Sequence, residues 1–245
     1  MENIVILICT LIFYQASAVV FFPPEVEFCQ RDENLSECYK EQITKCFKIF
    51  KSGSQQLGIP KLDPFYVPKV DISGSPGQSI ALNQSYYNMY TYGISTSYID
   101  ESRVDLDKCY WSLLVTTPVI RIETDYHFNG KVLLLPIDSQ GKCNVTIINL
   151  RNHHQSWCER YKKKGKSHIR ITNYTMNMLA DDARFDFQPA EENSIIEKVI
   201  DTVNEESIDT FNDLKIGFQE IWSALHMQTA NNVFSKIPDD ELFPY

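Results

Sequence analysis

The sequence predicts an α+β protein in which an antiparallel β-sheet curls around one long C-terminal α-helix. Residues 79–187 are rich in Tyr, Thr, Val and Ile and alternate apolar with polar positions, which is typical of strands with one buried face. From Glu205 to Phe234 the apolar residues recur instead at three- and four-residue steps, which indicates a helix. That helix is apolar on more than one side, which favours its enclosure by the sheet, and irregularly spaced aromatic residues favour a hydrophobic tunnel between the two layers.

The first eighteen residues are expected to form a secretory signal peptide. The apolar run from Ile4 to Tyr14 is too short to span a bilayer, and Ala16-Ser17-Ala18 is a small-x-small cleavage signal. The usual basic residues are absent, so an N-terminal anchor or a buried helix is the alternative. We expect cleavage after Ala18, one domain over residues 19–245 and a secreted, extracellular protein, because no later stretch is long and apolar enough to hold the chain in a membrane.

The overall charge excludes some classes of partner. The chain has 23 Lys and Arg against 32 Asp and Glu, a formal net charge of −9, which argues against nucleic acid and anionic membranes. The one basic cluster, from Arg160 to Arg170, contains Gly165 and is followed by β-prone residues. We therefore interpret it as a solvated hairpin loop.

Six of the seven cysteines remain once Cys9 leaves with the signal peptide. An even number in a secreted chain predicts disulfide bonds. Cys29 and Cys38 are close enough in sequence to close a short local loop. For the others we expect Cys143 to pair with Cys158 across a hairpin, and Cys46 with Cys109 between the early helix and a strand. Four N-glycosylation sequons, at Asn34, Asn83, Asn144 and Asn173, are expected to face solvent.

The segments before the sheet have distinct patterns. Residues 36–50 place apolar side chains at helical spacing, which predicts an amphipathic helix. The next segment, LGIPKLDPFYVP, has three prolines in nine positions, so it is an extended linker or an edge strand that leads into the sheet. Phe65 and Tyr66 at its end are expected to close one end of the tunnel.

The clearest strand runs from Ile120 to Phe128. Its even-numbered residues are apolar or small and its odd-numbered residues are charged or polar, so one face is buried. Asn129-Gly130 then predicts a hairpin turn. The return strand, residues 131–137, is apolar on both faces and is expected to be covered on both sides.

Several short motifs, taken in order, resemble those of the takeout and juvenile hormone binding protein family of insects. They are Cys29 with Cys38, Gly58-Ile59-Pro60 with Asp63-Pro64, Gly93-Ile94-Ser95, Tyr126 with Gly130, and Ile237-Pro238 with Leu242-Phe243-Pro244. The resemblance covers nearly the whole mature chain. It implies a strongly curved antiparallel sheet that wraps the C-terminal helix and encloses a hydrophobic tunnel. It also implies secreted, non-catalytic carriers of juvenile hormones, fatty acids or pheromone-like compounds, linked to feeding, circadian output and chemosensation.

This sequence departs from the family pattern at Cys46, Cys109, Cys143 and Cys158 and in the basic insertion from Lys162 to Lys166. These departures leave the implied fold in place but make the ligand harder to infer.

Aromatic and aliphatic residues on the strands and the long helix are the candidate ligand-binding residues, and the competing interpretation is that they fill a solid core. The candidates are Tyr86, Tyr90, Trp111, Ile120, Ile122, Tyr126, Phe128, Phe211, Leu214, Phe218 and Trp222. No nucleophile motif or phosphate loop is present, so we expect neither an enzyme nor a cofactor. His153, His154, Cys143 and Cys158 match no common zinc template, and disulfides are the preferred use of the cysteines.

Two functions remain open from the sequence. The first is a monomeric extracellular carrier of one small hydrophobic ligand. The second is a secreted glycoprotein that acts through its surface on a cell-surface receptor, with the tunnel filled by side chains. A continuous cavity would favour the first, whereas a filled core with an exposed apolar patch would favour the second.

Overall fold

The computed structural model describes residues 22–74, 80–132, 135–191 and 193–245. The predicted signal peptide lies outside the described residues. The described strands form one seven-stranded antiparallel sheet, β1-β2-β4-β5-β6, in which β3 also pairs with β4 and β7 with β5. The strands are β1 (Phe65–Ile72), β2 (Ile80–Tyr92), β3 (Tyr98–Asp105), β4 (Tyr110–Val132), β5 (Leu135–Lys163), β6 (Lys166–Leu179) and β7 (Asp182–Pro189).

Two very long central strands carry the architecture. β4 has 23 residues and β5 has 29, whereas strands usually have about 3 to 10. The first part of β4 pairs with β3 and the rest with β2, while the first part of β5 pairs with β7 and the rest with β6. The sheet therefore consists of two halves that share their central strands, and its twist along such strands produces the predicted curvature.

A change in side-chain direction marks the boundary between the halves. On β5 the buried positions are odd at Cys143 and Ile147 but even at Leu150 and His154. Asn149, between them, has a left-handed φ of 49°. Asparagine tolerates that conformation better than most residues, so the strand can shift its inward face here without ending.

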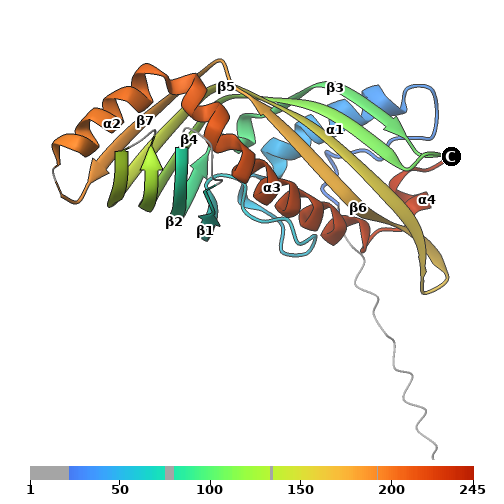
Figure 1. Cartoon of the computed structure of the whole chain (residues 1–245). Helices are drawn as coiled ribbons and strands as arrows, with labels where there is room; N and C mark the ends of the chain where they lie inside the picture. Colours follow the sequence, from blue (N-terminus) through green and yellow to red (C-terminus); the bar gives the residue numbers. More distant parts are fainter. Residues whose placement is uncertain (1–21, 75–79, 133–134, 192) are drawn as a thin grey trace, which may run out of the picture.

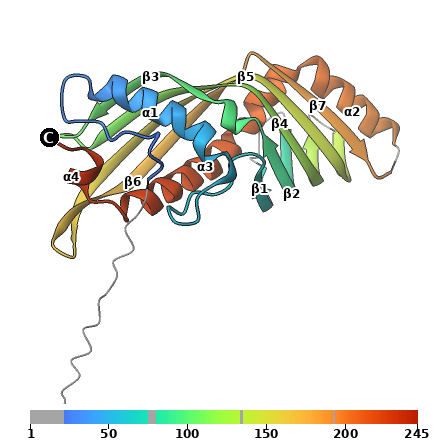
Figure 2. The same ribbon diagram turned by 180° about the vertical axis from the view of Figure 1, so that it is seen from behind.

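The helices lie on one side of the sheet and at its two ends. They are α1 (Leu35–Ile49), α2 (Ser194–Glu205), α3 (Ser207–Phe234) and α4 (Asp239–Leu242), with short 3-10 turns η1 (Phe50–Ser52) and η2 (Ile94–Thr96). Helix α3 runs along the sheet from α2, which lies near β7, to α4 and the C-terminus, near β3 and α1 (Figure 1). Figure 2 shows α1 beside β3 in the view from behind. The predicted early helix and long C-terminal helix are both present.

Two sequence-based expectations about these elements are wrong, and helix α2, which follows Pro189 and the acidic residues after it, was not predicted. Helix α3 is not enclosed on all sides, because Ile216 on its far side is 48% exposed. Asn129-Gly130 is not a turn, because β4 continues to Val132 and is paired there on both sides, Gly130 with Leu82 of β2 and with Ile137 of β5.

Gly130 is needed for close approach rather than for a turn. Its φ is 149°, and a Cβ at this position would lie 2.3 Å from the carbonyl oxygen of Ala81. Any side chain would push β2 away from β4. The glycine of Asn129-Gly130 is therefore explained by the close approach of β2 to β4.

The basic cluster forms the hairpin between β5 and β6, as expected. Lys164 and Gly165 have φ values of 50° and 82°, which suit a two-residue hairpin turn. Lys166 pairs with Glu241, and Lys163 donates to the carbonyl oxygen of Ser235 at 2.6 Å. The hairpin therefore binds the C-terminal segment through two of its lysines, which are not simply solvated.

The structure confirms one of the predicted disulfide bonds and shows that the other predicted pairs are wrong. Cys29 and Cys38 are bonded, as expected. The second bond joins Cys109 to Cys158, so the expected Cys143–Cys158 and Cys46–Cys109 pairs are wrong. The reason is the strand register: Cys109 directly precedes β4, and its carbonyl oxygen accepts from the amide of Cys158 on the adjacent β5 at 2.9 Å. Cys46 and Cys143 are free thiols.

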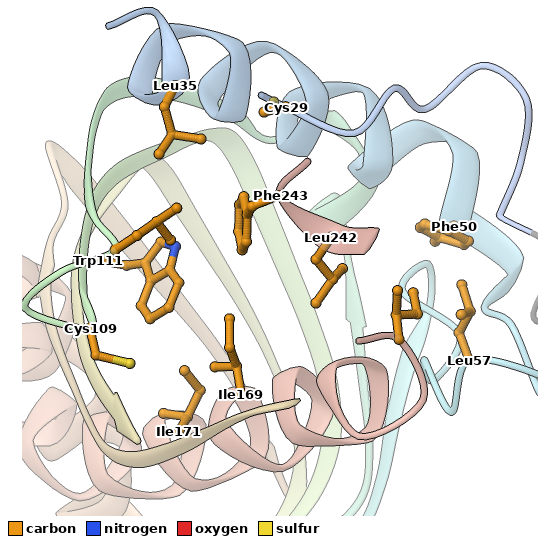
Figure 3. Close-up of a cluster of buried hydrophobic side chains, with 12 residues drawn as sticks. Cys29, Leu35, Phe50, Leu57, Cys109, Trp111, Ile169, Ile171, Leu242 and Phe243 are labelled. Atoms are coloured by element: carbon orange, nitrogen blue, oxygen red, sulfur yellow. The ribbon is translucent and has the colours of Figure 1, made fainter. Parts of the chain in front are cut away.

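One end of the molecule is filled by a core that joins the first and the last described segments of the chain. Trp111, Ile169, Ile171, Leu242 and Phe243 pack beneath α1 together with the residues of the first disulfide (Figure 3). Leu242 and Phe243 are both under 8% exposed, which explains why the C-terminal Leu-Phe-Pro motif is apolar. This core closes the space between the sheet and the helices at the α1 end.

A buried carboxylate ties this end together. Asp239 is 4% exposed and lies 3.0 Å from Arg31 and 2.8 Å from Arg160. Arg31 also donates to the carbonyl oxygen of Phe243, and Arg160 to that of Leu106. The N-terminal segment, the end of β5 and the C-terminal segment are thereby linked through one ionic cluster.

The proline-rich segment is a linker that enters the edge strand β1, as predicted, but it is not extended throughout, because Leu57 and Gly58 lie in a turn in which Gly58 has a φ of 73°. The carboxylate of Asp63 accepts hydrogen bonds from the amide of Gly93 at 3.2 Å and from Ser95 Oγ at 2.6 Å. A Cβ at Gly93, whose φ is 101°, would lie 2.1 Å from the carbonyl oxygen of Val119. Two motifs that are distant in sequence therefore form one contact.

No helix in the described ranges has the length and apolarity to cross a bilayer.

Candidate functional site: an apolar cavity

A cavity of about 430 Å³ lies between the inward face of the sheet and helix α3. Its volume falls in the range of about 300 to 1,000 Å³ that small-molecule sites occupy. Its walls come from α1, α3, the linker before β1, and all seven strands β1 to β7. Most lining side chains are aliphatic or aromatic, so the cavity suits an apolar occupant.

Aromatic contacts connect the sheet to the helix across the edges of the cavity. Phe65 packs on Trp222 with ring centroids 5.2 Å apart, and Tyr86 packs on Phe218 at 5.3 Å. Phe65 is buried and lines the cavity, and its role in closing one end stays a prediction. Tyr66 does not line the cavity: it is 47% exposed, and its ring contacts that of Tyr90 in a tilted arrangement on the outer face of the sheet.

A smaller cavity of about 60 Å³ lies under α2. Phe128, Phe187 and Leu214 line both spaces. Its other walls include Tyr126 and Val199. The apolar space therefore extends toward the α2 end of the molecule.

The central strand β5 brings polar groups into the large cavity. Asn152, His154 and Ser156 occupy alternate positions and all line the cavity. Tyr174 of β6 and His226 of α3 lie beside them, and the His154 ring centroid is 5.8 Å from that of Tyr174 and 5.2 Å from that of His226. We call these five residues the polar stripe.

Burial and hydrogen bonding keep the titratable side chains of the polar stripe neutral. Tyr174 Oη lies 2.9 Å from His154 Nδ1, and His226 Nδ1 donates to the carbonyl oxygen of Trp222 at 2.7 Å. Burial holds the pKa of His154 well below its usual 6.5, with a further contribution from His226, and burial also lowers the pKa of His226. Both imidazoles are therefore neutral at physiological pH, and burial raises the pKa of Tyr174, so its phenol is neutral as well.

The two free cysteines also line the cavity but are not reactive groups. Burial raises the pKa of Cys46 to about 11 and raises that of Cys143 further. Since the thiolate is the nucleophilic form, both side chains act as small apolar groups. His153 faces outward to Ser112, and no cluster of His, Cys, Asp or Glu suited to a metal ion occurs in the part of the chain that the structure describes.

Comparison with known proteins places this geometry in a family. The sequence profile of the haemolymph juvenile hormone binding proteins matches residues 5–244. The chain belongs to the haemolymph juvenile hormone binding protein family. It is similar to the circadian clock-controlled protein daywake of Drosophila yakuba, with 23% identity over 91% of this chain and 88% of the relative. The daywake protein of Drosophila melanogaster is also 23% identical, with the same coverage.

Among solved structures, Takeout 1 of Epiphyas postvittana superimposes with a TM-score of 0.79 at 18% identity. The alignment covers 90% of this chain and all of the other. This match confirms the fold that the motifs predicted, a long curved antiparallel sheet with a long C-terminal helix.

Within this juvenile hormone binding protein fold, the predicted ligand-binding residues separate into three groups. Those that line the large cavity are Tyr86, Trp111, Ile120, Ile122, Phe128, Phe211, Leu214, Phe218 and Trp222. Tyr126 lines the small cavity instead, and its hydroxyl lies 3.0 Å from Ser139 Oγ. Tyr90 is 39% exposed on the outer face and lies outside both cavities. The reason is a register shift in β2 between Tyr87 and Tyr90, after which the Tyr90 side chain points to the outer face of the sheet.

The sequons agree with the fold. Asn34, Asn83, Asn144 and Asn173 are all exposed, so a glycan at any of them would point away from the cavity. Glycosylation of these four asparagines stays a prediction.

The polar stripe was not predicted, because the sequence indicated His153 and His154 only as candidate zinc ligands. A sequence signal was available, since Asn152, His154 and Ser156 alternate along a strand. The β-sheet period of two places all three on one face. Sequence alone did not show that this face is the inward one.

The two buried histidines predict acid sensitivity. Their pKa values in the folded protein lie below the value of about 6.5 in the unfolded chain, so the unfolded chain takes up protons first as the pH falls. The free energy of unfolding should therefore decrease below about pH 6.5, by up to about 1.4 kcal/mol per pH unit for each histidine. Chemical unfolding at pH 7.5 and 5.5 measures this.

A matched pair of variants separates the histidines from the carboxylates, which also titrate in acid. His226→Leu should reduce the pH dependence, whereas His153→Leu, which changes an outward-facing histidine, should retain it. Equal pH dependence in both variants would contradict the assignment.

Proposed function

We propose that this protein is a secreted carrier that binds one small hydrophobic ligand in the large cavity. The candidate ligands are juvenile hormone-like terpenoids, fatty acyl compounds and pheromone-like compounds. The observation that carries the proposal is the continuous apolar cavity of about 430 Å³ between sheet and helix. Each 100 Å² of apolar ligand surface buried there contributes about 2.5 kcal/mol.

Other features support secretion and carriage without catalysis. Two disulfide bonds suit an oxidising compartment, and the N-terminal sequence has the pattern of a cleaved signal. Burial raises the pKa of both cysteines of the cavity, so neither provides a thiolate nucleophile. The relatives named for circadian control suggest a role in clock output, and the family name suggests circulation in haemolymph.

A receptor-directed function is the second candidate. Tyr66, Tyr87 and Tyr90 are 47%, 37% and 39% exposed on β1 and β2, facing away from the cavity. Such a group of aromatic side chains is the kind of surface that a protein partner contacts. It is compatible with carriage, since a receptor can recognise the loaded carrier.

The first test is native mass spectrometry of the protein secreted from insect cells, followed by extraction and identification of what is released. We expect one hydrophobic compound per protein chain. A protein that is empty and also fails to bind terpenoids and fatty acids would overturn the carrier proposal and favour the receptor-directed function.

A substitution that fills the cavity provides the second test. Ala230 lies on the cavity face of α3, whereas Ala224 of the same helix is exposed. In Ala230→Trp the indole should displace about 60 Å² of apolar ligand surface and weaken binding about tenfold or more. Ala224→Trp is the matched control and should bind as the parent does. Circular dichroism checks that both variants fold, and equal affinities would place the ligand outside this cavity.

A further inference from the structure

The polar stripe has more hydrogen-bonding capacity than the protein uses. His226 Nδ1 carries the proton because its partner, the carbonyl oxygen of Trp222, can only accept. In the neutral ring Nε2 is therefore an acceptor, and it has no donor among the described residues. This acceptor lies on α3, opposite β5.

The His154–Tyr174 pair always leaves one donor and one acceptor unused. If the phenol donates to Nδ1, then Nε2–H of His154 is free to donate and the phenol oxygen is free to accept. If Nδ1–H donates to the phenol oxygen, the phenol O–H is the free donor and Nε2 the free acceptor. The pair therefore suits a partner that can both donate and accept.

Two further unpaired groups lie at the same level of the sheet. Trp111 is opposite Ser156 in the strand register, is 3% exposed, and its indole Nε1–H has no hydrogen-bond partner among the described residues. Asn152 Oδ1 is likewise buried without a partner there. Both residues line the cavity. Buried polar groups are normally satisfied, so an unpaired donor and acceptor beside the stripe indicate a missing partner.

We infer that the polar stripe binds the hydroxyl group of an otherwise apolar ligand, so that the cavity selects a long-chain or terpenoid alcohol. This inference rests on the proposed carrier function and specifies its ligand class. A hydroxyl donates one proton and accepts through its lone pairs, which matches the free acceptor of His226 and the free donors of the stripe and Trp111.

Other ligand classes fit less well. A hydrocarbon leaves the buried groups unpaired, and an ether or ester accepts but offers no proton to His226 Nε2. A carboxylate held at the polar stripe needs a cation there, but the one ammonium group in the described lining, Lys215 Nζ, donates to the carbonyl oxygen of Met178 at 3.0 Å and to Asn212 Oδ1 at 2.8 Å and makes no hydrogen bond to a residue of the stripe. Burying an uncompensated carboxylate is costly.

The test is a competition assay on the full secreted chain with four probes of one chain length. Dodecan-1-ol, 1-methoxydodecane, dodecane and dodecanoate displace a fluorescent apolar reporter at pH 7.5. We expect the alcohol to bind about fivefold tighter than the ether, since one net hydrogen bond is gained, and tighter than the hydrocarbon and the carboxylate. Equal affinity of alcohol and ether, or preference for the carboxylate, would overturn the inference.

Variants locate the preference. His154→Leu and His226→Leu should reduce the alcohol-to-ether ratio to near one while dodecane still binds, and His153→Leu, on the adjacent outward-facing position, should keep it. A preference that survives both cavity variants would place the hydroxyl elsewhere. If none of the four probes binds the parent protein, the carrier proposal itself fails, which distinguishes the two failures.

A measurement on the parent protein needs no substitution. The ¹⁵N resonance of His226 Nε2 should shift when dodecan-1-ol is added and stay unchanged with 1-methoxydodecane. Identical responses to both probes would contradict the role assigned to His226.

Discussion

Replacing Cys109 and Cys158 by alanine should lower the free energy of unfolding by about 4 kcal/mol, because the bond closes a loop of about 50 residues in the unfolded chain. The two cysteines are 49 positions apart, and the intervening chain includes most of both central strands. Without the bond, the unfolded ensemble gains the entropy that this constraint removes. Guanidinium unfolding of the purified variant measures the change.

The second disulfide of the same protein is the control for this prediction. Cys29 and Cys38 are only 9 positions apart, so their replacement by alanine should cost about 2.5 kcal/mol. The order of the two effects, rather than either value alone, tests the loop-closure explanation. A larger loss in the Cys29/Cys38 variant would show that local packing near α1 dominates instead.

The error in predicting this bond shows where sequence reasoning ends. Cys29–Cys38 was predictable because proximity in sequence implies proximity in space. Cys109 and Cys158 become neighbours only through the register of two long antiparallel strands, which depends on how each turn and bend is made. Nothing in the spacing of the cysteines encodes that register.

The main elements of the fold were predictable because they obey simple periods. The alternation from Ile120 to Phe128 and the helical stripe from Phe211 to Trp222 each indicate one buried face. Asn129-Gly130 led to the wrong prediction of a turn, because an Asn-Gly dipeptide can form a hairpin turn or, as here, allow a neighbouring strand to approach closely. Its glycine admits the neighbouring strand β2, a constraint that exists only after the sheet has formed.

The apolar walls of the cavity were predictable for the same reason, but its polar stripe was not. Periodicity places Asn152, His154 and Ser156 on one face, and the usual rule assigns a polar face to solvent. Here Leu150 and Met176, on the same strand and on its neighbour, show that this face is inward. A polar face that points into an apolar cavity is a functional signal because its burial needs compensation.

The second large effect is expected at the buried ionic cluster. Asp239→Asn removes the charge that two arginines share, and it should lower the free energy of unfolding by about 3 kcal/mol or more, as for other buried pairs that lose one partner. The loss arises because Arg31 and Arg160, whose side chains are 17% and 33% exposed, keep their charge without a counter-ion. Thermal and guanidinium unfolding both report it.

The neighbouring carboxylate provides a matched control. Asp240 is exposed, so Asp240→Asn makes the same chemical change one residue away and should alter the free energy of unfolding by less than about 0.5 kcal/mol. The Asp239 cluster joins the N-terminal segment, the end of β5 and the C-terminal segment, all at the α1 end of the cavity. Asp239→Asn should therefore also speed ligand release, because this end opens more often. Unchanged release together with the stability loss would show that the ligand leaves at the α2 end.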